Sequence, residues 1–310
     1  YVDDALFEKG RSYVLLENSS SAAQAFEKLI REFPQSSLAR KAGIQLGLLY
    51  YNDNQPEKAL AAYKQVISNY PGSEEAKIAL QDLKSVYIDL NDINAYASYV
   101  NSIGGNIRLE VGEQDSLTYI AAEKLFMRGD NDGARRSLIN YLQTFPEGAF
   151  SSNANFYLGS IAFAKKEFDE AIQRFKSVIA SGDTKFLEES VARTAEIEYL
   201  SKDYPAALES FKRLQIVAEN PENRQAARLG IMRCALQTGQ QKDALLAADE
   251  LLKEPKLSPE LEAEARYVRA KAYIAQKQAN KALADLKELS KDTRTVHGAE
   301  AKYLLAQLYY

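Results

Sequence analysis

The side chains that most often bind metals or carry catalysis are scarce in this chain of 310 residues, which has one cysteine, Cys234, and one histidine, His297. A zinc site built from cysteine and histidine needs several such ligands, and an H-E-x-x-H site needs two histidines on one helix face. Both kinds of site are therefore excluded. Cys234 lies in an apolar helical pattern and is expected in the core, whereas His297 is expected in a solvated loop at 295–298.

Three short motifs could bind ions, and each has a simpler structural explanation. The Asp-Asn-Asp-Gly sequence at 130–133 resembles the start of a calcium loop. It lacks the glycine at the sixth and the glutamate at the twelfth loop position, so we expect a turn there. The paired glycines at 104–105 lack the lysine and the spacing of a phosphate-binding loop. The acidic run at 260–264 suits the start of a helix, where the macrodipole favours negative charge. We predict no catalytic site, no metal site and no cofactor, and hence no enzyme.

Charge and hydropathy restrict the kind of partner. The formal net charge is −4, from 39 Lys and Arg and 43 Asp and Glu, and both signs are interspersed along the chain. This argues against nucleic acid as the main partner. No run approaches the roughly 18 apolar residues that a membrane helix needs, so we expect no transmembrane segment.

Small residues recur along the chain at a nearly fixed interval, which indicates a repeated structural unit. An alanine follows a polar turn every 36 to 38 residues, and a small residue lies about twelve positions before it in all units but one, where Met232 takes its place. Such a period is typical of a repeat fold. The first series is Ala22, Ala59, Ala97, Ala134, Ala171, Ala207, Ala244 and Ala282, and the second is Gly10, Gly47, Ser85, Ala122, Gly159, Ala195, Ala270 and Ala306.

Within each unit the apolar spacing is that of a helix. In the fifth unit the apolar residues fall at i, i+1, i+4, i+7 and i+8, which is one stripe of a helix. A similar stripe at 154–162 precedes it, and about four residues at 165–168 join the two. Aromatic-proline pairs at 33–34, 70–71 and 145–146 are expected to end second helices. The pattern predicts a helical hairpin in each unit.

These residues resemble the tetratricopeptide repeat (TPR) family, whose repeat has small residues at its eighth and twentieth positions, aromatics at the eleventh and twenty-fourth, and proline at the thirty-second. The first two units carry Gly10, Tyr13, Ala22, Phe26 and Pro34, and then Gly47, Tyr50, Ala59, Tyr63 and Pro71. The resemblance implies an all-α fold: an α-solenoid, a right-handed superhelix of about eight hairpins with a period of about 37 residues, followed by the start of a ninth.

The period is longer than the 34 residues usual in the family. With the Phe-Pro-x-Ser and Tyr-Pro-x-Ser phrases at 33–36 and 70–73, it is similar to bacterial envelope TPR proteins of the outer-membrane assembly lipoprotein and Tol–Pal coordinator type, and to long TPR proteins of Bacteroides-type bacteria. This resemblance implies a periplasmic or outer-membrane-associated location in a Gram-negative bacterium. The Asp-Ser-Leu sequence at 115–117 matches an O-glycosylation sequon of such bacteria, unless Ser116 simply begins a helix.

The third unit is irregular, because Asn101 stands where an aromatic belongs and glycines follow it. We predict N-terminal repeats at 1–103, a linker or hinge at 104–113, and C-terminal repeats at 114–310; the alternative is a longer loop without motion. The chain is expected to be a piece of a longer protein, truncated inside a ninth repeat. Self-association through this end is expected if a second copy covers its apolar stripe of Ala301, Leu304, Leu305 and Leu308.

In TPR proteins the first helices of the hairpins line a concave groove, and here the matching positions are rich in aromatics. The resemblance implies that this groove binds an extended or helical segment of a partner protein; the alternative is that the stripe is core. The groove candidates are Phe7, Arg11, Tyr51, Tyr119, Glu123, Phe126, Phe156, Phe163, Tyr199, Arg233, Tyr267 and Lys271.

The sequence thus predicts a protein-protein interaction scaffold, with envelope assembly or maintenance as its expected setting. Two alternatives remain. The chain could be a structural spacer or self-associating array within a larger protein, or a non-catalytic part of a larger enzyme or glycan-handling system.

Overall fold

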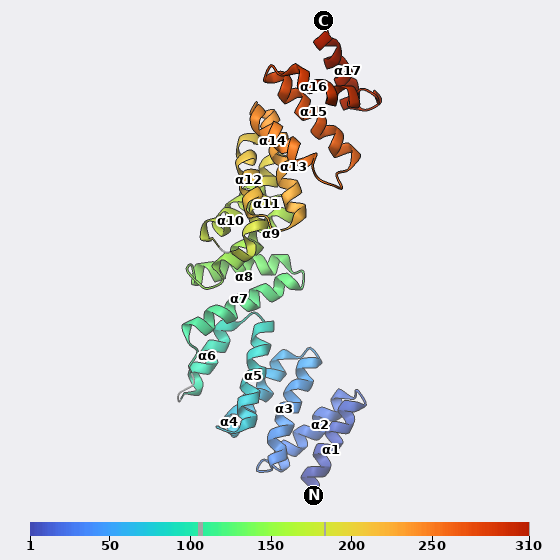
Figure 1. Cartoon of the computed structure of the whole chain (residues 1–310). Helices are drawn as coiled ribbons and strands as arrows, with labels where there is room; N and C mark the ends of the chain where they lie inside the picture. The colour runs from blue at the N-terminus through green and yellow to red at the C-terminus, as the bar shows by residue number, and fades with distance from the viewer. Residues whose placement is uncertain (105–107, 183, 310) are drawn as a thin grey trace. The chain divides into compact units, whose positions relative to one another are not determined.

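Helices pair in chain order throughout the computed structural model, which describes residues 1–104, 108–182 and 184–309 (Figure 1). Those residues form seventeen α-helices and no strand, which confirms the predicted all-α repeat fold. The chain forms two units, residues 1–150 and 151–310. The first contains α1 (Val2–Leu15), α2 (Ser19–Glu32), α3 (Ser37–Asn52), α4 (Pro56–Asn69), α5 (Glu74–Asp89), α6 (Ile93–Ile103), α7 (Val111–Met127) and α8 (Asn131–Thr144).

The second unit contains four further hairpins and the first helix of another. Its helices are α9 (Ser151–Ala164), α10 (Phe168–Ser181), α11 (Thr184–Leu200), α12 (Tyr204–Val217), α13 (Pro221–Gln237), α14 (Gln241–Leu251), α15 (Pro259–Ala275), α16 (Ala279–Leu289) and α17 (Val296–Tyr309). In the described residues of each unit, helices pack only against helices one or two places away in chain order. This is the arrangement of a helical solenoid, in which each repeat contacts its neighbours. No helix in the described ranges combines the length and apolar character needed to cross a bilayer.

Every hairpin turn contains one residue in the left-handed backbone region. In the fifth hairpin this residue is Lys166, with φ of 61°. Its N–H donates to the Phe163 carbonyl over 2.9 Å, and the next N–H donates to the Ala162 carbonyl over 2.9 Å. These two bonds end the first helix as a Schellman motif. The equivalent residues are Glu17, Asn54, Asn91, Gly129, Lys166, Lys202, Gly239 and Lys277.

The two helices of a hairpin approach closely because a small residue faces a buried ring. A Cβ added to Gly10, Gly47 or Gly159 would overlap the ring of an aromatic residue on the following helix. These partners are Phe26, Tyr63 and Phe175, each at most 1% exposed. These three members of the small-residue series therefore mark where paired helices touch.

The third hairpin departs from this pattern. Helix α6 ends at Ile103 and is followed by Gly104, whose φ is 77°, and Ser85 on α5, the hairpin's residue of the second small-residue series, is exposed. The linker predicted at 104–113 includes residues 105–107, which lie outside the described residues, and α7 begins at Val111 within it. The two compact units divide after Phe150. The linker at 104–113 and the domain boundaries at 103 and 114 stay predictions.

Candidate functional site

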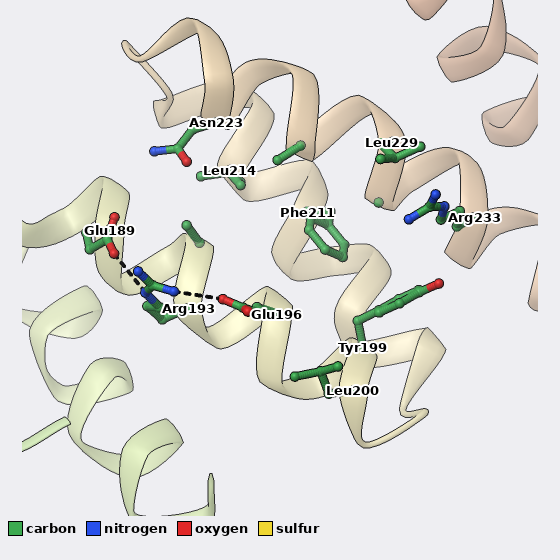
Figure 2. A pocket seen from close by; sticks show the side chains of 13 residues that line it. Glu189, Arg193, Glu196, Tyr199, Leu200, Phe211, Leu214, Asn223, Leu229 and Arg233 are labelled. Carbon is green, nitrogen blue, oxygen red and sulfur yellow. Dashed lines mark hydrogen bonds and ion pairs between the residues drawn. The ribbon is translucent and has the colours of Figure 1, made fainter. Parts of the chain in front are cut away.

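A cavity of about 310 Å³ opens between α11 and α13 in the second unit, above α12 (Figure 2). Both walls are first helices of hairpins, and the floor comes from the second helix between them. Since first helices are the elements that line the concave side in the predicted groove, the cavity lies where that groove is expected.

The floor of the cavity is apolar. Phe211 and Leu214 of α12 form it and are 9% and 1% exposed. Gly230 on α13 keeps the wall close to this floor, because a Cβ there would meet the ring of Phe211. Leu229 adds to the α13 wall, and Leu200, at the end of α11, is 56% exposed at the mouth. The cavity therefore presents carbon surface that a partner side chain could cover.

The α11 wall carries a three-residue charge cluster. Arg193 donates through Nε to Glu189 over 2.8 Å and through Nη1 to Glu196 over 3.0 Å (Figure 2). Its guanidinium also lies 4.9 Å from the ring centre of Phe163 on α9. Spacings of four and three residues place these side chains on one helix face. The cluster holds one cation and two carboxylates, so this wall has a net charge of about −1.

The α13 wall carries a cation that is already paired. Arg233 donates through Nε and Nη2 to the two carboxylate oxygens of Glu264 on α15, both over 2.7 Å. This bidentate pair raises the pKa of Arg233. Across the cavity, Tyr199 lies edge-on to Phe211 with ring centres 6.4 Å apart. Because the rim charges are paired and the floor is apolar, the cavity suits an apolar side chain flanked by polar groups.

Family comparisons agree with the repeat pattern. Residues 2–86 match a family model described as an outer membrane lipoprotein, and residues 121–184 match one described as a tetratricopeptide repeat. The match at 121–184 agrees with the tetratricopeptide repeat pattern of the sequence, and the described residues have the all-helical repeat fold that this pattern predicts. A search of curated proteins gave no match.

Several solved structures are similar to this chain. MamA has 16% identity, covers 59% of this chain and 94% of its own, and has a TM-score of 0.42. A tetratricopeptide repeat protein from Parabacteroides merdae has 15% identity, covers 86% and 98%, and has a TM-score of 0.33. YrrB, described as a TPR protein with an unusual peptide-binding site, has 18% identity, covers 67% and 99%, and has a TM-score of 0.34.

Among the predicted groove residues of the second unit, Tyr199 and Arg233 line the cavity. Phe156 is half-buried and stacks on Phe186 of α11 with ring centres 4.2 Å apart. Phe163 lies under Arg193, as described above. The other two lie on α15, where the Lys271 ammonium is 5.4 Å from the ring centre of Tyr267. Burial, and then a hydrogen bond with Glu300, raises the pKa of Tyr267.

Several predicted groove residues of the first unit already contact other residues of that unit. Tyr119 is 2% exposed, stacks on Phe150 at 4.5 Å and donates to Glu123 over 2.6 Å. Its ring therefore offers little surface to a partner. Phe7 packs on Phe26 at 5.9 Å.

The remaining three candidates of the first unit differ in exposure. Arg11 is exposed and pairs with Glu8 at 3.1 Å. The Tyr51 hydroxyl donates to Asp89, and Phe126 is half-buried. A groove role for all twelve candidates stays a prediction.

The structure also locates the residues first considered for chemistry. Cys234 is fully buried, as expected, and burial raises the pKa of its thiol to about 11. The expectation for His297 is wrong: it lies in the first turn of α17, half-buried, with its ring 4.9 Å from Tyr267. Asp130 accepts the N–H of Gly133 over 2.9 Å and caps α8, consistent with the predicted turn. In the described ranges, no group of three His, Cys, Asp or Glu residues could hold a metal ion.

The possible glycosylation sequon lies inside a helix. Ser116 Oγ donates to the Gly112 carbonyl over 2.9 Å. Asp115 is 8% exposed and accepts from the Tyr141 hydroxyl over 2.5 Å and from the Ala149 N–H over 2.8 Å. An enzyme that reads the aspartate would have to reach it before this part of the chain folds.

Sequence reasoning missed Arg193, Leu229 and the floor residue Phe211. The acidic residues three and four positions away from Arg193 were a usable signal, because such spacing places charges on one helix face. Glu264 was assigned to a solvated helix start, whereas it holds Arg233. That pair joins neighbouring hairpins, and spacing within one repeat carries no information about it.

Proposed function

We propose that this TPR protein is a non-catalytic scaffold whose second unit binds a segment of a partner protein between α11 and α13. The observation that carries the proposal is the cavity of about 310 Å³ with its apolar floor. An inserted leucine or phenylalanine side chain would contribute about 1.5–3 kcal/mol of binding free energy. That amount corresponds to roughly ten- to hundredfold in the dissociation constant.

The rim supports a preferred orientation of the segment. The α11 wall carries an excess of one carboxylate over cations, so it favours a basic residue of the partner beside the inserted side chain. The α13 wall carries Arg233, whose positive charge is balanced by the paired carboxylate of Glu264. A partner segment with an apolar anchor and a basic flank fits this distribution, and rim charges of this kind select partners more than they add affinity.

An envelope setting is part of the same proposal. The match of residues 2–86 to a family model described as an outer membrane lipoprotein supports it. Fractionation of the source cells with an antibody against this chain tests the setting. Recovery in the cytoplasmic fraction alone would contradict it and would leave the groove proposal standing.

The groove is tested with two matched substitutions. Leu200 at the cavity mouth is 56% exposed, and Leu246 on α14, away from the cavity, is 54% exposed. Each is replaced by aspartate, and binding of the identified partner is measured by calorimetry after circular dichroism confirms folding. We expect at least tenfold weaker binding for Leu200→Asp and no change for Leu246→Asp. Equal effects of the two substitutions would contradict the proposal.

A photo-crosslinking residue locates the partner independently of affinity. It is placed at Ala226, which lines the cavity and is exposed, or at Leu246 as a control. We expect crosslinks to one continuous partner segment from Ala226 only. Crosslinks from Leu246 alone would show that the partner binds on the side of the second helices and would contradict the proposal.

Self-association is a second candidate, favoured by the exposed aromatics of α17. Tyr303 and Tyr309 are 64% and 65% exposed, and aromatic side chains are frequent in interfaces. Sedimentation velocity at several concentrations tests it. Self-association predicts a mass that rises with concentration and that Tyr303→Glu returns to the monomer value, whereas a monomer throughout excludes it.

A further inference from the structure

A second cleft, of about 320 Å³, lies in the first unit, on the side of the second helices rather than on the side of the first helices where a TPR groove is expected. The start of α6 and the middle of α8 form its walls, and α7 forms its floor. Its lining is made largely of side-chain amides and hydroxyls. This cleft is separate from the proposed groove and does not depend on it.

The amides of this cleft are available for a ligand. Within the described part of the chain, the side chains of Asn94, Gln114 and Asn140 make no hydrogen bond to another residue, and Arg136 has no ion-pair partner. By contrast, Asn91 is fixed by donating to the Ser137 hydroxyl over 2.6 Å, a contact that ties α8 to the turn before α6. Three amides with unused donors and acceptors therefore converge on one cavity.

Comparison with an earlier repeat shows that the fold does not require all of this polar lining. Equivalent positions two repeats apart differ by 75 residues, as Ala59 and Ala134 do (134 − 59 = 75). A cleft also lies between α2 and α4, two repeats earlier. Its residues Ala39, Gly43, Ala61 and Ala62 correspond to Gln114, Thr118, Arg136 and Ser137. At these four positions the α6–α8 cleft has a side chain that can form hydrogen bonds where the earlier cleft has none. The positions of Asn140 and Thr144 are polar in both clefts, as Gln65 and Asn69.

The lining restricts the class of ligand. Each amide both donates and accepts hydrogen bonds, as neighbouring hydroxyl groups of a sugar do. Asp92, which caps α6 by accepting the Ala95 N–H over 3.1 Å, and Arg136 carry opposite charges, so the cleft has no net preference for an ion. The apolar lining residue Ile93 is 4% exposed, so no anchor pocket is open for the side chains of a peptide.

We propose that the cleft between α6 and α8 binds a neutral carbohydrate unit through Asn94, Gln114 and Asn140. The ligand's hydroxyl groups would pair with the three amides and displace water from them. The first unit would then recognise a glycan while the second unit recognises a protein segment.

The test follows the side-chain amide signals of the full chain by two-dimensional ¹H–¹⁵N NMR. The probes are glucose, galactose, mannose and xylose, and a neutral hexasaccharide of each. We expect saturable shifts of the Asn94, Gln114 and Asn140 signals with at least one probe. Gln65 and Asn69 are the matched internal controls, because they occupy the equivalent positions of the α2–α4 cleft.

Two variants and two further probes complete the experiment. Asn140→Ala should weaken binding of the best probe about tenfold or more, as expected from losing a cooperative pair of hydrogen bonds. Its matched control, Gln65→Ala, should leave binding unchanged. No saturable shift with any sugar, or equal losses in both variants, would overturn the proposal. So would shifts at the cleft amides that arise only with inorganic phosphate or with an apolar peptide.

Discussion

The close contact between Gly159 and Phe175 makes a quantitative prediction about how the hairpins are held. A Cβ at position 159 would lie 2.8 Å from the nearest ring atom of Phe175, which is 0% exposed. Ordinary contacts begin near 3.4 Å, so the ring would have to retreat by about 0.6 Å into packed surroundings. Overpacking of this kind costs about 1–3 kcal/mol.

The opposing effect is helix propensity, because alanine favours a helix over glycine by about 1 kcal/mol. For Gly159→Ala we therefore expect a net loss of up to about 2 kcal/mol. Gly112 on α7 is the control, because a Cβ there meets nothing within 4 Å. Gly112→Ala should stabilise the protein by up to about 1 kcal/mol.

Native-state hydrogen exchange measures both effects locally, which matters because a repeat array does not need to unfold in one step. Amide protection of α9 and α10 should fall in Gly159→Ala, and that of α7 should rise in Gly112→Ala. A smaller side chain at position 175 should relieve the clash, so Phe175→Leu should cost less in the Gly159→Ala background than alone. If Gly159→Ala stabilises its hairpin as much as Gly112→Ala stabilises its own, the account of the packing is refuted.

Three further predictions concern turns, buried charge and pH. Lys166→Gly should stabilise the protein by about 0.5–1 kcal/mol in urea denaturation, because glycine adopts the left-handed turn without strain; a loss would contradict the turn geometry. Asp285→Ala should cost about 3 kcal/mol in thermal unfolding, because Asp285 is 2% exposed and accepts two hydrogen bonds from Arg269, over 2.7 and 2.8 Å; an Arg269→Met background should recover part of the loss. Burial raises the pKa of Asp89, but bonds from Lys124 and other groups outweigh it, and the pKa lies below the ordinary 3.8. Ionised Asp89 therefore stabilises the folded first unit at pH values above 3.8, and this stabilisation is lost as the pH falls through the lowered pKa. Asp89→Asn should make the stability of the first unit depend less on pH in the acid range.

The fold could be predicted because the features that specify it repeat. Gly10, Gly47 and Gly159 recur at the points where paired helices touch, and each faces a buried aromatic. Two independent series with one period identify both the hairpins and their spacing. Tertiary packing adds detail to this pattern without changing it.

The site could be predicted only in part, because it depends on contacts between hairpins. Positions 199 and 233 were identified from their place in the repeat, but the floor depends on Gly230, which lies outside the small-residue series and contacts Phe211 of the preceding hairpin. In the same way, Tyr119 occupies a groove position and is nonetheless buried by Phe150. A residue's place in the repeat gives its helix face, whereas burial depends on what the neighbouring hairpin supplies.

His297 was misplaced for a local reason. Gly298 suggested a loop, but glycine is needed there because a Cβ would collide with the Asp292 carbonyl. Thr295 accepts the Gly298 N–H over 3.0 Å and starts α17 one turn earlier than expected. The left-handed backbone at three of the turns could not be predicted either, because lysine occupies that position and is not typical of turns.

Contacts limited to neighbouring hairpins have a mechanical consequence. Even Asn91 and Ser137, 46 residues apart, belong to adjacent hairpins. A force applied along either unit would therefore load one hairpin boundary at a time, and rupture would not require distant parts of the chain to separate. Each event would release one repeat, about 130 Å of extended chain at 3.5 Å per residue. Such a unit would yield in even steps and could re-form hairpin by hairpin on its remaining neighbours when the load falls.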